Sequence, residues 1–81
     1  MKVSYRKLNT GNYYGHYGKY YILIRKREHF KYEGFEKYVF WYTAYIGLNG
    51  EWIYAEGMFG SYLKTIKKAK SWVKEKLKSI S

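Results

Sequence analysis

The chain of 81 residues has no cysteine and no aspartate, so its six acidic residues are all glutamate. Without cysteine it can form neither a disulfide nor a thiolate-bound metal site, which fits a reducing compartment such as the cytoplasm. Without aspartate as well, a two-metal nuclease is not expected. The two histidines, His16 and His29, have a spacing that matches no metal motif. The sequence therefore predicts a protein without enzymatic activity, metal or cofactor.

Long apolar runs are missing too. No stretch of about 18 apolar residues occurs, so a membrane-spanning helix is not expected. The first residues, MKVSYRKLNTG, lack the apolar segment of a signal peptide. We expect one small domain over residues 1–81. Its core must be modest, because a chain this short buries only about 60 % of the surface that its unfolded form exposes.

Among the charged residues, basic side chains are in large excess. Sixteen Lys and Arg against six Glu give a formal net charge of +10. A field of this sign favours polyanions such as nucleic acid, an anionic membrane surface or an acidic protein. A compositional bias toward lysine on a solvated surface would give the same charge, so the charge alone does not establish binding.

The stretch 37–56, KYVFWYTAYIGLNGEWIYAE, predicts two antiparallel strands joined at Asn49-Gly50. This dipeptide is a strong hairpin signal, because a type I′ turn needs positive φ at both turn residues. The pairs expected from this turn are Leu48 with Glu51, Ile46 with Ile53, Ala44 with Ala55, and Tyr45 with Tyr54. The aliphatic residues would then share one face and the large aromatic residues the other.

Weak alternation at about 2–8 and strong β-propensity at 19–27 predict two further strands, separated by a loop at 9–18 that is rich in Tyr and Gly. Placing Ile22 beside Ile46 and Ile24 beside Ala44 aligns the aliphatic rows. It also places Arg27 near Trp41. Residues 62–79 form an amphipathic pattern that follows an N-cap at Ser61. Its apolar stripe, predicted to pack on the aliphatic face of the sheet, is Tyr62, Leu63, Ile66, Ala69, Val73, Leu77 and Ile80.

The predicted fold is therefore α+β. It has a three- to four-stranded antiparallel meander sheet, with strands at about 2–8, 19–27, 37–48 and 51–56. One C-terminal amphipathic helix, at about 62–79, packs on one face of the sheet. Since one helix covers only one face, the other face is expected to meet water.

Two groups of residues are candidates for binding. Those predicted on the uncovered sheet face are Arg25, Arg27, Trp41, Tyr45, Trp52 and Tyr54. Those on the helix are Lys64, Lys67, Lys68, Trp72, Lys74 and Lys78. Aromatic and Arg side chains suit base stacking, and Lys suits phosphates. The sequence thus predicts a small module that binds DNA or RNA. Against this, the Tyr-rich loop, the first strand or a second copy of the chain could cover the face, and the helix residues could be solvated or packed.

The same aromatic face also suits a protein interface, because interface hot spots favour Trp, Tyr and Arg. In size and make-up the chain resembles the small counter-defence proteins of phages and mobile elements, anti-CRISPRs among them. This resemblance implies an inhibitor or adaptor that binds an acidic protein or a nucleoprotein complex. A homodimer formed through the aromatic face is a third expectation.

Overall fold

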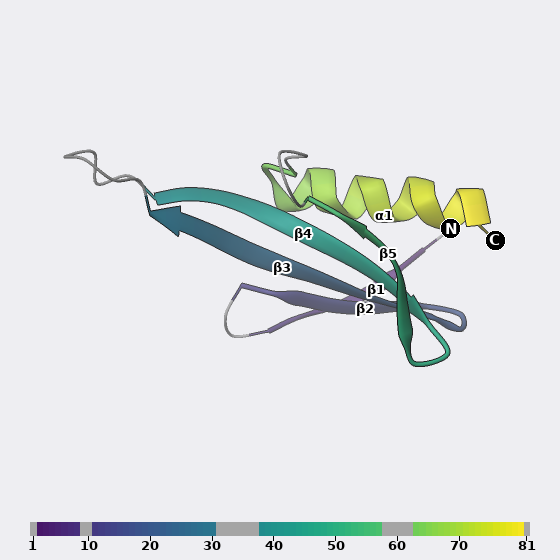
Figure 1. Ribbon diagram of the computed structural model, residues 1–81. Coiled ribbons are helices and arrows are strands. Elements are labelled where there is room, and N and C mark those ends of the chain that lie inside the picture. The colour runs from purple at the N-terminus through teal and green to yellow at the C-terminus, as the bar shows by residue number, and fades with distance from the viewer. Residues whose placement is uncertain (1, 9–10, 31–37, 58–62, 81) are drawn as a thin grey trace.

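A computed structural model describes residues 2–8, 11–30, 38–57 and 63–80, with the backbone alone at 28–30 and 38–39. The described residues form one open antiparallel sheet and one helix (Figure 1). The strands lie in the sheet in chain order: β1 (Ser4–Lys7), β2 (Tyr13–Tyr17), β3 (Tyr20–Phe30), β4 (Tyr38–Leu48) and β5 (Glu51–Glu56). The helix α1 (Ile66–Ile80) follows them. The predicted class, an α+β meander with a C-terminal helix, is confirmed, but the sheet has five strands.

The additional strand is β2, which lies inside the segment predicted as a loop. It pairs with β1 on one side and with β3 on the other, with Tyr13 opposite Ile24 and Tyr17 opposite Tyr20. The three glycines of this segment indicated turns. Gly15, however, sits within the strand, where the ring of Tyr5 from β1 lies against its backbone. Cross-strand cover by an aromatic ring thus lets a glycine remain in a strand that its own propensity disfavours.

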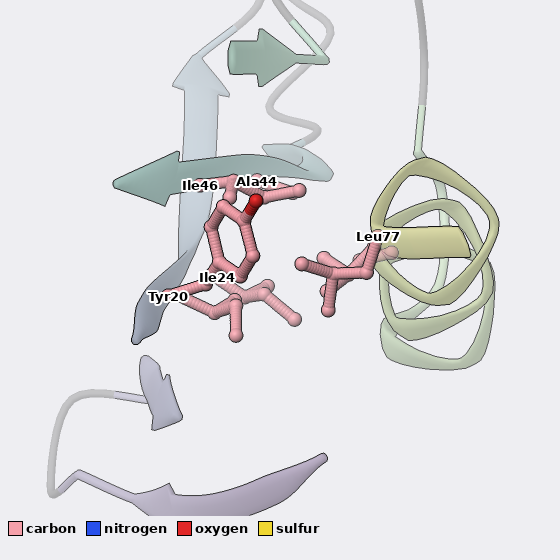
Figure 2. Packing of buried hydrophobic residues seen from close by; sticks show 8 residues of the cluster. Tyr20, Ile24, Ala44, Ile46 and Leu77 are labelled. Carbon is pink, nitrogen blue, oxygen red and sulfur yellow. The ribbon is translucent and has the colours of Figure 1, made fainter. Parts of the chain in front are cut away.

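The central ladder between β3 and β4 has the predicted register. Ile22 lies opposite Ile46, Ile24 opposite Ala44, and Arg27 opposite Trp41. The aliphatic residues of these rows are fully buried under the helix, and Figure 2 shows Leu77 reaching from α1 toward them. The whole buried cluster is Tyr20, Ile22, Ile24, Ala44, Ile46, Ala69, Val73 and Leu77.

The helix begins later than predicted. It starts at Ile66, and Thr65 is its cap, since the Thr65 Oγ1 accepts a hydrogen bond of 3.1 Å from the Lys68 backbone N–H. Leu63 is instead bridged to the sheet, where its carbonyl accepts from the Tyr42 N–H at 2.8 Å. The backbone before Thr65 therefore bonds to β4 rather than to a helical turn. The predicted N-cap Ser61, with Tyr62, lies outside the described residues.

The hairpin from β4 to β5 has the predicted turn but not the predicted pairs. Asn49 and Gly50 have φ values of 54° and 82°, both positive as a type I′ turn requires. Leu48 lies opposite Glu51, but the register then shifts between Ile46 and Gly47. Trp52 lies opposite Gly47 and Tyr54 opposite Ile46, so Ile53 is the extra residue of a β-bulge.

The bulge overturns three of the four expected pairs, and it also changes which side chains reach the core. Tyr45 pairs with Ala55 rather than with Tyr54, and Ala44 pairs with Glu56. One extra residue reverses the alternation of faces beyond it. Tyr54 therefore turns to the helix side, where it packs against the core cluster, while Ile53 is 39 % exposed.

On the helix side, Tyr5 packs against the rim of the core beneath Lys70, whose Nζ lies 4.8 Å from the ring centroid. Its hydroxyl is buried and has no hydrogen-bond partner among the described residues. Burial raises the pKa of Tyr5 from 10.0 to about 12, because it disfavours the charged phenolate.

This raised pKa predicts a loss of stability at alkaline pH. Between pH 10 and about 12 the unfolded chain has released the Tyr5 proton and the folded chain retains it, so the free energy of unfolding falls as the pH rises. Tyr5→Phe removes an unpaired buried hydroxyl. We expect it to leave the free energy of unfolding unchanged or slightly higher at about pH 8, and to flatten the decline above pH 10. Urea unfolding at several pH values measures both effects.

The matched control is Tyr14→Phe, because the Tyr14 side chain is 46 % exposed. This variant should keep the alkaline decline of the parent chain. An equally steep decline in Tyr5→Phe would contradict the assignment of the raised pKa to Tyr5.

Candidate functional site

The sheet face opposite α1, called here the open face, is covered by no helix among the described residues (Figure 1). Its side chains alternate with those of the core, so the strand registers determine its composition. It includes Arg6, Tyr14, His16, Tyr21, Leu23, Arg25, Arg27, Trp41, Thr43, Tyr45 and Trp52. All five strands thus contribute to one surface that is aromatic and basic.

Three rings gather at the end of this face next to the β4–β5 turn. Trp52 lies edge-on to Tyr21, with ring centroids 5.2 Å apart and an interplanar angle of 72°. It is also 5.7 Å from Tyr45, at a tilt of 53°. The Tyr21 hydroxyl donates to the Glu51 carbonyl at 3.3 Å, which ties the cluster to the turn. Trp52 remains 49 % exposed, so this ring is both braced by its neighbours and accessible.

Gly47 makes room for this cluster. It is buried, and a Cβ placed on it would overlap the ring of Tyr21. The Tyr21 ring therefore occupies the space in which any other residue would have a side chain. A glycine in a strand often marks such a close approach. Its position at the bulge lets the Trp52 ring from β5 meet the Tyr21 ring from β3 across β4.

The other end of the open face is basic. Arg25 lies opposite Thr43 and Arg27 opposite Trp41. Since β2 pairs with β3 only as far as Ile24 and β5 with β4 only as far as Ala44, these pairs lie on a two-strand part of the described ladder. Arg25 is exposed and Trp41 half-buried, while the buried Thr43 hydroxyl has no hydrogen-bond partner among the described residues.

The described carboxylates all lie elsewhere. Glu51 is paired with Leu48 and Glu56 with Ala44, which places both on the helix side of the sheet. Glu75 lies on the exposed side of α1, 3.9 Å from the Nζ of Lys78. The open face therefore holds Arg6, Arg25 and Arg27 with no described carboxylate beside them, and its local field is positive.

The sequence-predicted site residues divide into two groups. The open face brings together Arg25, Arg27, Trp41, Tyr45 and Trp52. Tyr54 was wrongly placed with them, because the bulge turns it to the helix side, where the Lys76 Nζ lies 4.2 Å from its ring centroid. The predicted lysines near and on α1 are exposed, but on the far side of the sheet: Lys64, Lys67, Lys68, Lys74 and Lys78. Trp72 is half-buried and packs against the core cluster.

Sequence reasoning did not name Tyr21, Tyr14 or Arg6 among the candidate binding residues. Strict alternation along β3 places Tyr21 on the same face as Arg25, and that signal was present in the sequence. Tyr14 and Arg6 depend on β2 pairing with both neighbours, which the loop assignment of residues 9–18 excluded.

Comparison of the chain with protein-family models, with curated proteins and with solved structures finds no match. In the described ranges, no group of three or more His, Asp or Glu side chains could hold a metal ion. No described helix is both long and apolar enough to cross a bilayer. The geometry of the open face is therefore the feature that bears most directly on function.

The packing of Tyr21 on Gly47 can be tested with a double-mutant cycle. Gly47→Ala forces the Tyr21 ring off the strand, and we expect overpacking to lower the free energy of unfolding by about 1–3 kcal/mol. In the background Tyr21→Ala the new methyl group has space, so the same substitution should cost much less. Denaturant unfolding of the four proteins gives the coupling energy. An equal cost in both backgrounds would show that the ring does not occupy this space.

Proposed function

We propose that this protein is a non-enzymatic module that binds nucleic acid through its open face. The observation that supports this most directly is the combination of half-exposed rings and arginines on a sheet face without a described carboxylate. Ordinary exposed sheet faces are polar, and an exposed aromatic patch tends to mark an interaction site.

The two ends of the open face suit the two parts of a nucleotide. Trp52, Tyr21 and Tyr45 present ring faces and edges on which bases stack, at about 1–3 kcal/mol per base. Arg25 and Arg27 are bidentate donors for phosphate. The lysines of the helix lie on the other side of the sheet, so their part is to strengthen the positive field that attracts the polyanion.

A protein partner is the second candidate. Trp52, half-exposed and braced by two tyrosines, has the character of an interface anchor. An acidic protein or a nucleoprotein complex would match the arginines, and the protein would then act as an inhibitor or adaptor rather than as a nucleic-acid carrier.

The first proposal is tested by fluorescence anisotropy with labelled DNA and RNA oligonucleotides at low and physiological salt. Trp52→Ala and Arg25→Ala should weaken binding clearly, the ring substitution by about 1–3 kcal/mol. Lys67→Ala, an exposed helix substitution, is the matched control and should weaken it only slightly, through the general field.

Equal weakening by all three substitutions would place binding outside the open face. No binding to either nucleic acid, with retention of an acidic protein from nuclease-treated lysate that Trp52→Ala abolishes, would favour the second candidate.

A further inference from the structure

We infer that the ligand of the open face is a single strand of about four nucleotides that runs along β3 and β4. This inference rests on the proposed nucleic-acid function and adds the strandedness, path and length of the ligand. It follows from three features of the face: the accessibility of its rings, their spacing along the strands and the number of its arginines.

The rings require unpaired bases. Trp52 is 49 % exposed, and Tyr21, Tyr45 and Trp41 are half-buried on the same broad sheet surface. In a duplex the base faces are stacked on one another, and a protein reaches only base edges and the backbone. A duplex would leave these rings unused, whereas a single strand can splay its bases onto them.

The path follows from the strand registers. Tyr21 and Trp52 lie level with Gly47, and Tyr45 lies level with Leu23, one row further along the face. Arg25 occupies the next row and Arg27 with Trp41 the one after it. Rows on one face are two residues apart, or about 6.6–6.8 Å, so the four rows span about 20 Å. With one nucleotide to each row, the face holds about four nucleotides, the lower end of the range for single-strand binding folds.

The order of side chains along this path is aromatic, aromatic, basic, and then basic with aromatic. One base would stack on Trp52 and the next on Tyr45. The phosphate that follows the second base would meet Arg25. A base at the far end of the path would stack on Trp41, beside Arg27. Thr43, level with Arg25, lies between the two aromatic rows on β4. The ladder of β3 and β4, together with Trp52 of β5, therefore supplies rings for the bases and arginines for the phosphates along the path.

The arginines set the expected salt dependence. For a single strand, the slope of log K against log salt is about −0.7 for each phosphate neutralised. Arg25 and Arg27 lie on the path and Arg6 lies two strands away from β3 at the edge of the same face. Two or three neutralised phosphates give a slope of about −1.4 to −2.1. Arg25→Ala should reduce the slope by about 0.7.

The test uses the full chain and anisotropy with four probes: labelled oligothymidines of about 4, 8 and 12 nucleotides, and a blunt duplex of about 12 base pairs. An 8-nucleotide strand whose sugars lack bases serves as a control for charge. We expect the intrinsic affinity to rise little beyond the length that fills the face. We expect the duplex and the base-free strand to bind more weakly, by about 5- to 150-fold, because the base-free strand has no base faces and the duplex stacks all but its terminal ones.

The variants separate stacking from folding. Trp52→Ala and Trp41→Ala should each lose about 5- to 150-fold in affinity for the 8-nucleotide strand, while Trp52→Phe, which keeps a ring, should recover most of the loss. Lys67→Ala is the control, and unfolding curves show whether each variant is folded.

The outcomes distinguish this inference from the proposed function. Suppose that duplex, base-free strand and oligothymidine bind with equal affinity, and that Arg25→Ala lowers this affinity while the Trp variants do not. This result would overturn single-strand stacking and leave nucleic-acid binding at the open face intact. No binding of any probe at low salt would overturn both. Affinity that continues to rise in proportion to length, with no effect of Trp41→Ala, would overturn the four-nucleotide path.

Discussion

The register between β3 and β4 is the constraint on which the rest of the structure depends. It brings Ile22 beside Ile46 and Ile24 beside Ala44, and these rows form the floor on which Val73 and Leu77 of α1 pack. Because side chains alternate strictly, the same register assigns Leu23 and Tyr45 to the opposite face. A slip of one residue would exchange the two sets and leave the aliphatic residues in water. The core and the open face are therefore two consequences of one pairing.

The many aromatic residues are used differently on the two sides of the sheet. On the helix side, three rings form part of the rim of a small core and lie under lysines: Tyr5 and Tyr13 under Lys70, and Tyr54 under Lys76. Phe40, which is 45 % exposed, lies under Lys26. Such cation–π contacts contribute about 0.5–1 kcal/mol at exposed sites. On the open face, the rings at the β4–β5 end contact one another and the backbone of Gly47 instead. Most rings on the helix side thus line the core, whereas Trp52 on the open face stays 49 % exposed.

The sequence was sufficient for features that depend on local chemistry. Asn49-Gly50 identified the turn, the aliphatic rows identified the β3–β4 register, and helical periodicity identified Ala69, Val73 and Leu77 as the packed stripe. It was insufficient where tertiary contacts decide. Gly15 was interpreted as a turn residue, because the Tyr5 ring that packs on it in the sheet comes from another strand. The bulge places Tyr54 rather than Ile53 beside Ile46 on the helix side, which the alternation of the sequence does not encode. Five of the six predicted open-face residues were therefore placed correctly, and Tyr54 was not.

The distribution of charge indicates which kind of partner the open face can accept. A two-fold dimer requires a self-complementary surface, because each residue of the patch meets the same patch on the other copy. Arg6, Arg25 and Arg27 have no described carboxylate on that face to meet, so two open faces would bring like charges together. Pairing through the sheet edges is also disfavoured, since β1 carries Arg6 and Lys7 and β5 is interrupted by its bulge. By charge, a second copy of the chain is therefore a poorer match than the anionic ligand with flat apolar surfaces that we propose for this face. Bases joined by phosphates combine these two properties along the direction in which the rings and arginines are ordered.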